Sequence, residues 1–492
     1  MTQTPHTQMR RLLGAAVLVA AMVSCKASEL DIPNPNAATV DGASADPTAL
    51  QLLATGLLVD QRGTRAGFIT NAGLFGREMY TFTPTEGRNV THGLIGIVVG
   101  GVTKLDPTGF AVGPWGGQYN VLRDIFNFKK TVDGSTTLTA SQKSAALGFA
   151  QTIEALMMFE LVQTHDTLGA ITEIKDDASQ LAPFVSRDSV YKYILNTLDN
   201  AASNLGNGGA AFPFTLGPGF AGFNTPTTYA TFTQALKAKA SAHYATAGGG
   251  APAWQSALTA LGKSFINAGA TTRIQFDAGV YDTYGVAPDS PNGLTQATNT
   301  NLYAHASFTT DAQLKANGSP DDRYTAKIRT GLPSRTGPLT ADGPTTGTSS
   351  IGFSIWPTTA SSIPVIRNEE LILIRAEAKL ATGDKAGAIA DLNQVRINSG
   401  GLPASTLTAG SSDDAVVNGI LYEKRYSLMM EGTRWIDHRR YNKLNLLPLD
   451  VATGPNKNFV AKVNPIPQGE CLVRAGVTGA LRGPNGQDNC AP

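Results

Sequence analysis

A dense group of charged residues surrounds one tryptophan in the segment EGTRWIDHRR. Glu431, Arg434 and Asp437 lie close together along the chain, beside the large ring of Trp435. Gly432 can adopt a backbone turn that other residues resist. The group could bind a polar ligand, or it could be a partly buried ion-pair network that fixes a helix end, since arginine forms forked bonds with carboxylates. We favour the structural interpretation, because buried polar networks mainly specify packing.

Sequence patterns that indicate catalysis or a cofactor are missing. The six histidines are scattered, and none has the spacing of metal ligands. Neither a nucleophile elbow nor a glycine-rich phosphate loop occurs. We therefore predict no catalytic residue, no metal site and no cofactor. A glycan hydrolase stays an alternative, because the two carboxylates of a glycosidase can lie far apart in a sequence.

The elements that must position the charged group are helices between Ile363 and Tyr441. Apolar residues recur at helical spacing from Leu371 onward, and we expect Asn368 to cap this helix. Gly383 should end it in the left-handed conformation, and Asp384 should cap the next one. Small alanines allow close helix pairs, as in tetratricopeptide repeats. The predicted fold is mainly α, a tetratricopeptide-like helix-pair solenoid with long irregular loop insertions.

Several segments resemble the SusD/RagB family, namely IPVIRNEELILIRAEA, GDKAGAIADLNQVR, LYEKRYSLMMEGTRWIDHRR and NPIPQGE. Two earlier segments, PWGGQYNVLRDIFNF and LGFAQTIEALMMFELVQTHDTLGAIT, are similar to the family's first two helical repeats. The resemblance covers most of the chain, loosely between about Gly206 and Ile363. This chain departs from the family at Lys424, where arginine is usual, at Ser427, where an acidic residue is usual, and at His438, where an apolar residue is usual.

The resemblance implies an outer-membrane lipoprotein that captures a nutrient, often a glycan, for a SusC-like, TonB-dependent transporter. Glycan binders stack sugar rings on exposed aromatic side chains, and loops normally carry such residues. Two regions qualify as loops, Gly67 to Phe110 and the breaker-rich excursion from Thr271 to Thr359. For each aromatic residue there, the alternative is an anchor that packs its loop on the helices. The predicted ligand contacts are Arg77, Tyr80, Phe82, Asn89, Tyr281, Tyr284, Tyr303 and Trp356.

The N-terminal residues predict an export signal. Arg10 and Arg11 precede an apolar run from Leu12 to Val23, which has the length of a signal-peptide core and is short for a membrane span. Small residues before Cys25 suit lipidation of that cysteine, and the alternative is an ordinary signal peptide with a coincidental cysteine. The predicted organisation is a signal peptide at 1–24, a lipidated tether at 25–46 and one domain at 47–492.

The remaining cysteines and the charge agree with an exported binding protein. Cys471 and Cys490 could form a disulfide outside the cytoplasm, or stay two free thiols. A net charge of +1 without a basic stripe argues against nucleic acid as a partner. Three other functions stay open: a secreted glycan hydrolase, a binder of peptides rather than glycans, and a helical adaptor that binds only protein.

Overall fold

A computed structural model describes residues 47–83, 86–177, 179–286, 289–296, 299–337 and 347–474. The predicted signal peptide and tether, including Cys25, lie outside these ranges. Cys471 is disulfide-bonded. Because Cys490 also lies outside the described residues, the pairing of these two cysteines stays a prediction.

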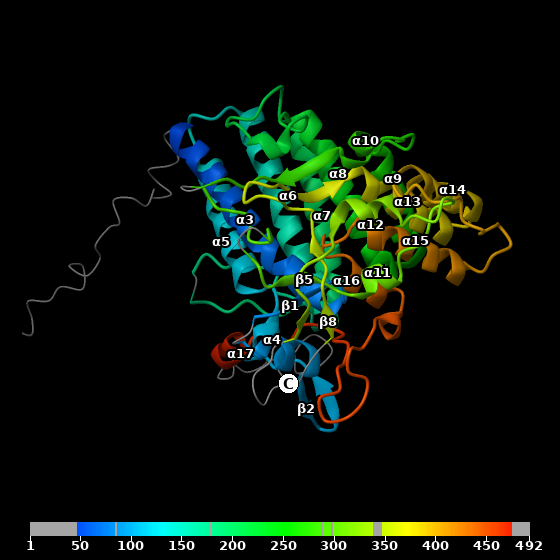
Figure 1. The fold of residues 1–492 in the computed structure, drawn as a ribbon. Helices are drawn as coiled ribbons and strands as arrows, with labels where there is room; N and C mark the ends of the chain where they lie inside the picture. The colour runs from blue at the N-terminus through cyan, green and yellow to red at the C-terminus, as the bar shows by residue number, and fades with distance from the viewer. Residues whose placement is uncertain are drawn as a thin grey trace, which may run out of the picture.

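The protein is a stack of long helices in which consecutive helices pack side by side (Figure 1). α13 packs on α8 and α9, and so joins a C-terminal set of helices to the N-terminal one. The predicted mainly α fold is confirmed. The N-terminal set comprises α3 (Pro47–Phe75), α5 (Gly116–Gly134), α6 (Ala140–His165), α7 (Arg187–Gly206), α8 (Pro226–Tyr244) and α9 (Gly250–Lys263). The C-terminal set comprises α13 (Asn368–Ala381), α14 (Lys385–Asn398), α15 (Asp413–Ser427) and α16 (Arg434–Arg440).

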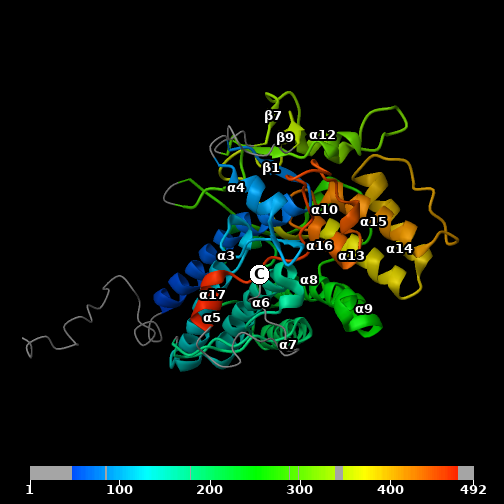
Figure 2. The same ribbon diagram turned by 90° about the horizontal axis from the view of Figure 1, so that it is seen from below.

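The strands of the described residues form short, two-stranded antiparallel sheets. The pairs are β1 (Met79–Thr81) with β5 (Leu302–Ala304), β2 (Ile97–Val99) with β3 (Val102–Lys104), β4 (Gly279–Asp282) with β10 (Ile363–Arg367), β6 (Ile328–Arg329) with β9 (Gly352–Phe353), and β7 (Arg335–Thr336) with β8 (Thr348–Ser349). The excursion at 271–359 contains the strands β4 to β9, together with the short helices α10 (Arg273–Asp277), α11 (Ser307–Thr310) and α12 (Asp322–Lys327). Figure 2 shows β7, β9 and α12 along one side of the helices. The described residues of the excursion therefore form short, irregular elements rather than long helices.

One helical stretch among the described residues, Ala140–Leu168, is long and apolar enough to cross a membrane by length and composition. Its apolar window is 89% buried inside the protein. Phe149 and Leu161 within it are fully covered by neighbouring helices. This stretch is therefore the central core helix of the stack, which explains its apolar composition on all sides.

The predicted helix ends are correct in part. Gly383 has φ of +93°, and the Asp384 side chain caps α14, as expected. The expectation for Asn368 is wrong, because Arg367 is the residue before α13 and Asn368 is already helical. The amide of Asn368 donates instead to the carbonyl of Asn267, at 3.1 Å. The Asn368 side chain therefore binds a residue that is distant in sequence and does not cap the helix.

The charged residues around Trp435 do not form one network. The Glu431 carboxylate pairs with Arg367 at 2.7 Å, and the same guanidinium pairs with Glu369. Asp437 belongs to a second network built on α13, α15 and α16. Arg434 forms no ion pair within the described part of the chain. The burial of Arg434, Trp435 and Asp437 agrees with a structural role, but the charged residues form two separate networks and not one.

The second network alternates two cations and two anions. Lys424 Nζ lies 2.7 Å from Glu377 Oε1 and 2.7 Å from Asp437 Oδ2. Arg440 bridges the other oxygens of the same two carboxylates, also at 2.7 Å. All four side chains are buried. Burial alone would raise the pKa of Asp437, but Lys424 and Arg440 outweigh burial and lower it.

Candidate ligand-binding groove

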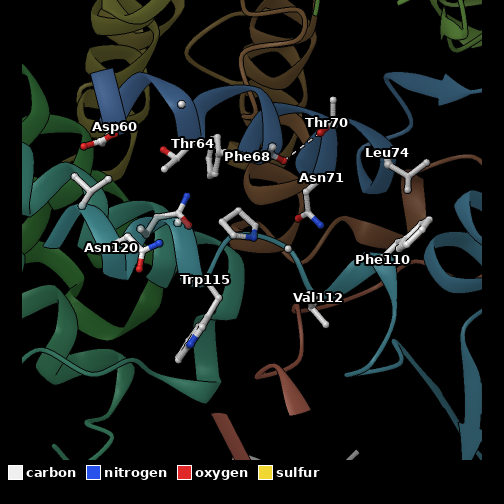
Figure 3. Close-up of a pocket in the computed structure, with 18 of the residues that line it drawn as sticks. Asp60, Thr64, Phe68, Thr70, Asn71, Leu74, Phe110, Val112, Trp115 and Asn120 are labelled. Carbon is white, nitrogen blue, oxygen red and sulfur yellow. Dashed lines mark hydrogen bonds between the residues drawn. The ribbon is translucent and has the colours of Figure 1, made fainter. Parts of the chain in front are cut away.

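An open groove of about 1040 Å³ lies between α3 and the start of α5. One wall is α3 from Val59 to Leu74. The other wall runs through α4 (Arg88–Val90), the short helix η3 (Phe110–Val112) and the first turns of α5. Figure 3 shows side chains from both walls facing the space between them, while Trp115 points away from it into the core.

Glycines keep the groove wide. A Cβ added at Gly63 or Gly67 on α3, or at Gly116 on α5, would meet no heavy atom within 4 Å. Glycine inside a helix lowers stability by up to about 1 kcal/mol relative to alanine. Because no neighbour crowds these positions, packing does not require glycine there. We infer that the glycines leave room for a ligand.

Polar side chains line both walls at helical spacing. Asp60, Thr64 and Asn71 share one face of α3, and Asn120 and Asp124 are four residues apart on α5. In Figure 3, Thr64 and Asn71 point toward the wall that carries Asn120. The buried Oδ1 atom of Asn71 has no hydrogen-bond partner among the described residues. A buried acceptor without a donor is unfavourable, so a hydroxyl group from a ligand would stabilise this site.

Two carboxylates lie on opposite walls of the groove, Asp60 on α3 and Asp124 on α5. Burial raises the pKa of Asp60. Burial also raises the pKa of Asp124, and the negative charge of Asp60 raises it further. When ionised, both groups only accept hydrogen bonds, so they suit hydroxyl donors.

Phe110 provides an exposed aromatic ring at the mouth of the groove. Its side chain is 55% exposed. The Arg88 guanidinium lies 4.0 Å from the ring centroid, and the His92 ring packs against it edge-on at 6.0 Å. These contacts hold the ring in place and leave much of it open, which is what stacking on a flat apolar ligand face needs.

Most of the predicted ligand contacts lie elsewhere. Five of them are buried, with 1–3% of each residue exposed, so a ligand cannot reach them in this structure: Arg77, Tyr80, Phe82, Tyr303 and Trp356. Tyr80, Phe82 and Tyr303 pack together in a small core of their own, and Trp356 lies in a larger one. The Arg77 guanidinium donates to the carbonyls of Pro448, at 3.0 Å, and Phe459, at 2.8 Å. Their burial does not support ligand contact for these five, and it agrees with the alternative that they anchor their loops.

The other three predicted contacts are accessible. Asn89 is half-buried and lines the groove. Tyr284 is half-buried and its hydroxyl donates to the carbonyl of Arg62, at 3.2 Å. Tyr281 is half-buried and lines a different cavity. Ligand contact by these residues stays a prediction.

The sequence interpretation missed the main residues of the groove, which are Asp60, Thr64, Asn71, Phe110, Asn120 and Asp124. One reason is that the sequence predicts a loop from Gly67, whereas α3 continues to Phe75. Phe68, Ile69 and Ala72 on this last part of α3 are buried. One sequence feature could have indicated the groove. Gly63 and Gly67 are four residues apart, and so are the polar residues Asp60 and Thr64 beside them.

Comparisons with known proteins identify the fold. A SusD-like carbohydrate-binding protein from Bacteroides fragilis is 16% identical, with a TM-score of 0.62 over 90% of this chain and 100% of the other. A SusD superfamily protein from Bacteroides vulgatus is 15% identical, with a TM-score of 0.61 over 87% and 97%. A laminarin-binding SusD-like protein is 16% identical, with a TM-score of 0.59 over 87% and 97%. The helical stack therefore has a SusD-like fold.

A sequence match agrees with this fold. The sequence model of the SusD family matches residues 266–471, which is less than half of the chain. Over these residues the match confirms the resemblance to the SusD/RagB family. No curated protein matches the chain. The groove residues between Val59 and Asp124 precede the matched region.

Proposed function

We propose that this protein binds a glycan in the groove between α3 and α5 without cleaving it. The observation that carries the proposal is a wide, open groove lined by polar side chains from two helices, among them Asn71, whose Oδ1 has no hydrogen-bond partner among the described residues. Carboxylates, amides and one exposed aromatic ring surround it, which are the groups that recognise hydroxyls and the apolar face of a sugar. Similar structures described as carbohydrate-binding and laminarin-binding support the proposal.

The proposal includes the cellular setting that the resemblance to the family implies. A lipid on Cys25 would hold the protein at the outer membrane, facing the cell surface. The protein would then deliver its ligand to a SusC-like, TonB-dependent transporter. Co-purification of an outer-membrane β-barrel with the tagged full chain, lost in Cys25→Ala because that variant leaves the membrane, is the result that supports this setting.

Affinity electrophoresis with an assay for released reducing ends tests the binding. Native gels containing laminarin, starch, xylan, mannan or pectin should retard the protein in at least one case, and incubation with that polysaccharide should release no reducing ends. The absence of retardation in a broad panel would contradict glycan binding and favour a peptide ligand or a protein-only adaptor.

One observation keeps the hydrolase alternative open. Asp60 and Asp124 interact across the groove, and paired carboxylates carry out glycoside hydrolysis. Release of reducing ends by the protein, and its loss in Asp60→Asn and Asp124→Asn, would establish an enzyme. Unchanged, zero release in all three proteins agrees with a binder.

Filling the groove from a glycine should abolish binding. Gly63→Trp places an indole in open space on α3, so we expect the helix to form and the affinity for the retained glycan to fall at least about a hundredfold, which is about 2.7 kcal/mol. Isothermal titration measures the affinity. The matched control is Gly262→Trp on α9, because a Cβ at Gly262 also meets open space but lies outside the groove. Equal affinities for both variants would contradict the placement of the site.

Removing the exposed ring should weaken binding and leave folding unchanged. Phe110→Ala removes the stacking surface, and we expect a roughly fivefold loss of affinity, since one aromatic contact contributes about 1 kcal/mol. Ile274→Ala is the control, because Ile274 is an exposed apolar residue on α10, away from the groove. Full affinity in Phe110→Ala would show that the ring does not contact the ligand.

A further inference from the structure

We propose that a second cavity, next to the groove along α3, is a subsite for the far end of an oligosaccharide. The proposal rests on the proposed function and deepens it, because it predicts a preference for long ligands. The cavity measures about 380 Å³. Its walls are the N-terminal half of α3, the segment from Thr215 through the short helix η5 (Pro218–Phe220), the end of β4 with Thr283, and Asp289.

The two cavities adjoin. Val59 on α3 lines both of them. Asp289 lines the second cavity, and its neighbour Ser290 lines the groove. The two cavities are therefore neighbours along α3, so one extended ligand could occupy both.

One residue that lines the second cavity, Arg62, also has an unsatisfied polar atom. The Arg62 guanidinium is fixed by two partners, since Nη1 donates to the carbonyl of Thr283 at 2.6 Å and Nη2 pairs with Asp289. Its buried Nε has no hydrogen-bond partner among the described residues. A ligand oxygen would supply the acceptor, as a hydroxyl would supply the donor that Asn71 lacks in the groove. Each cavity is thus lined by a residue that has a polar atom without a partner among the described residues.

The walls of the second cavity are rigid and partly aromatic. The Gln51 amide holds the backbone of Thr215, because its Oε1 accepts from the Thr215 N–H at 2.7 Å and its Nε2 donates to the Thr215 carbonyl at 3.1 Å. Gly219 packs so closely on β4 that an added Cβ would lie 1.9 Å from the carbonyl oxygen of Tyr281. Tyr281 and Phe220 supply aromatic surface. Preformed walls with mixed polar and aromatic groups suit a neutral, hydroxyl-rich chain.

Gly217→Trp tests the subsite. Gly217 lines the second cavity, has extended backbone that any residue adopts, and leaves open space where a Cβ would be added. The probes are size-fractionated disaccharides and octasaccharides from each polysaccharide that retards the protein in native gels. We expect the wild type to bind the octasaccharide at least tenfold more tightly than the disaccharide. Gly217→Trp should lose that advantage and bind the disaccharide within twofold of the wild type.

The other outcomes are distinguishable. Gly63→Trp should lose both probes, and Gly262→Trp should lose neither. If Gly217→Trp keeps the octasaccharide affinity, or weakens both probes equally, the second subsite is rejected and the groove proposal stands. Equal affinity of the wild type for both probes also rejects the second subsite. If the wild type binds no probe at all, the proposed function itself is overturned. If Gly217→Trp does not fold by thermal unfolding, Thr55→Trp replaces it, because Thr55 is exposed and lines the same cavity.

Discussion

Replacing Lys424 by methionine is expected to lower the free energy of unfolding by about 3–5 kcal/mol. Methionine keeps most of the volume of the lysine stem but removes the charge. Glu377 and Asp437 would then share only Arg440, and one buried negative charge would have no counterion. A buried charge without a partner loses its hydration and gains nothing in return. Urea unfolding at pH 7 measures the change.

A matched exposed ion pair provides the control. Lys192 pairs with Asp188 at 2.7 Å, but both side chains are more than half exposed. Lys192→Met should therefore cost about 1 kcal/mol or less. The deficit of Lys424→Met should shrink at pH 4, because protonation neutralises the carboxylates that have lost their cation. A deficit as small as that of Lys192→Met, or one independent of pH, would show that this network does not stabilise the fold.

Trp435→Ala is expected to lower the free energy of unfolding by about 3–5 kcal/mol, the usual range for removal of a buried aromatic side chain. Trp435 is fully buried and its Nε1 donates to the carbonyl of Ala461, at 2.7 Å. Its ring lies 5.0 Å from that of Phe75, at the end of α3. The tryptophan thus joins the C-terminal helices to the helix that carries the groove.

Trp435→Phe separates packing from the hydrogen bond. Phenylalanine keeps an aromatic ring against Phe75 but cannot donate to Ala461, so the loss should be smaller than for alanine. Denaturant unfolding of both variants gives the comparison. Equal losses for the two would show that the hydrogen bond, and not the ring, fixes this helix end.

The C-terminal helices could be predicted because their signals are local. Gly383 with positive φ and Asp384 as a cap follow from residue types at adjacent positions. The ion-pair networks could not be predicted in the same way. Lys424 and Glu377 are 47 residues apart and meet only after three helices have packed. The sequence therefore predicted one ion-pair network, whereas Glu431 and Asp437 belong to two different networks in the structure.

The groove was missed for a related reason. Glycines at Gly63 and Gly67 favour a loop, yet a buried apolar face that includes Phe68 and Ile69 holds the segment in a helix. Aromatic residues in loops also give no indication of their exposure. Trp356 is buried and Phe110 is exposed, because tertiary packing covers one and leaves the other open.

A crystal structure of the protein with the glycan that retards it in native gels is the most direct test of the groove. We predict ligand between Gly63 on α3 and Asn120 on α5, with a sugar hydroxyl within hydrogen-bond distance of Asn71 Oδ1 and a ring against Phe110. A glycan bound elsewhere on the protein, with the groove empty, would contradict the assignment.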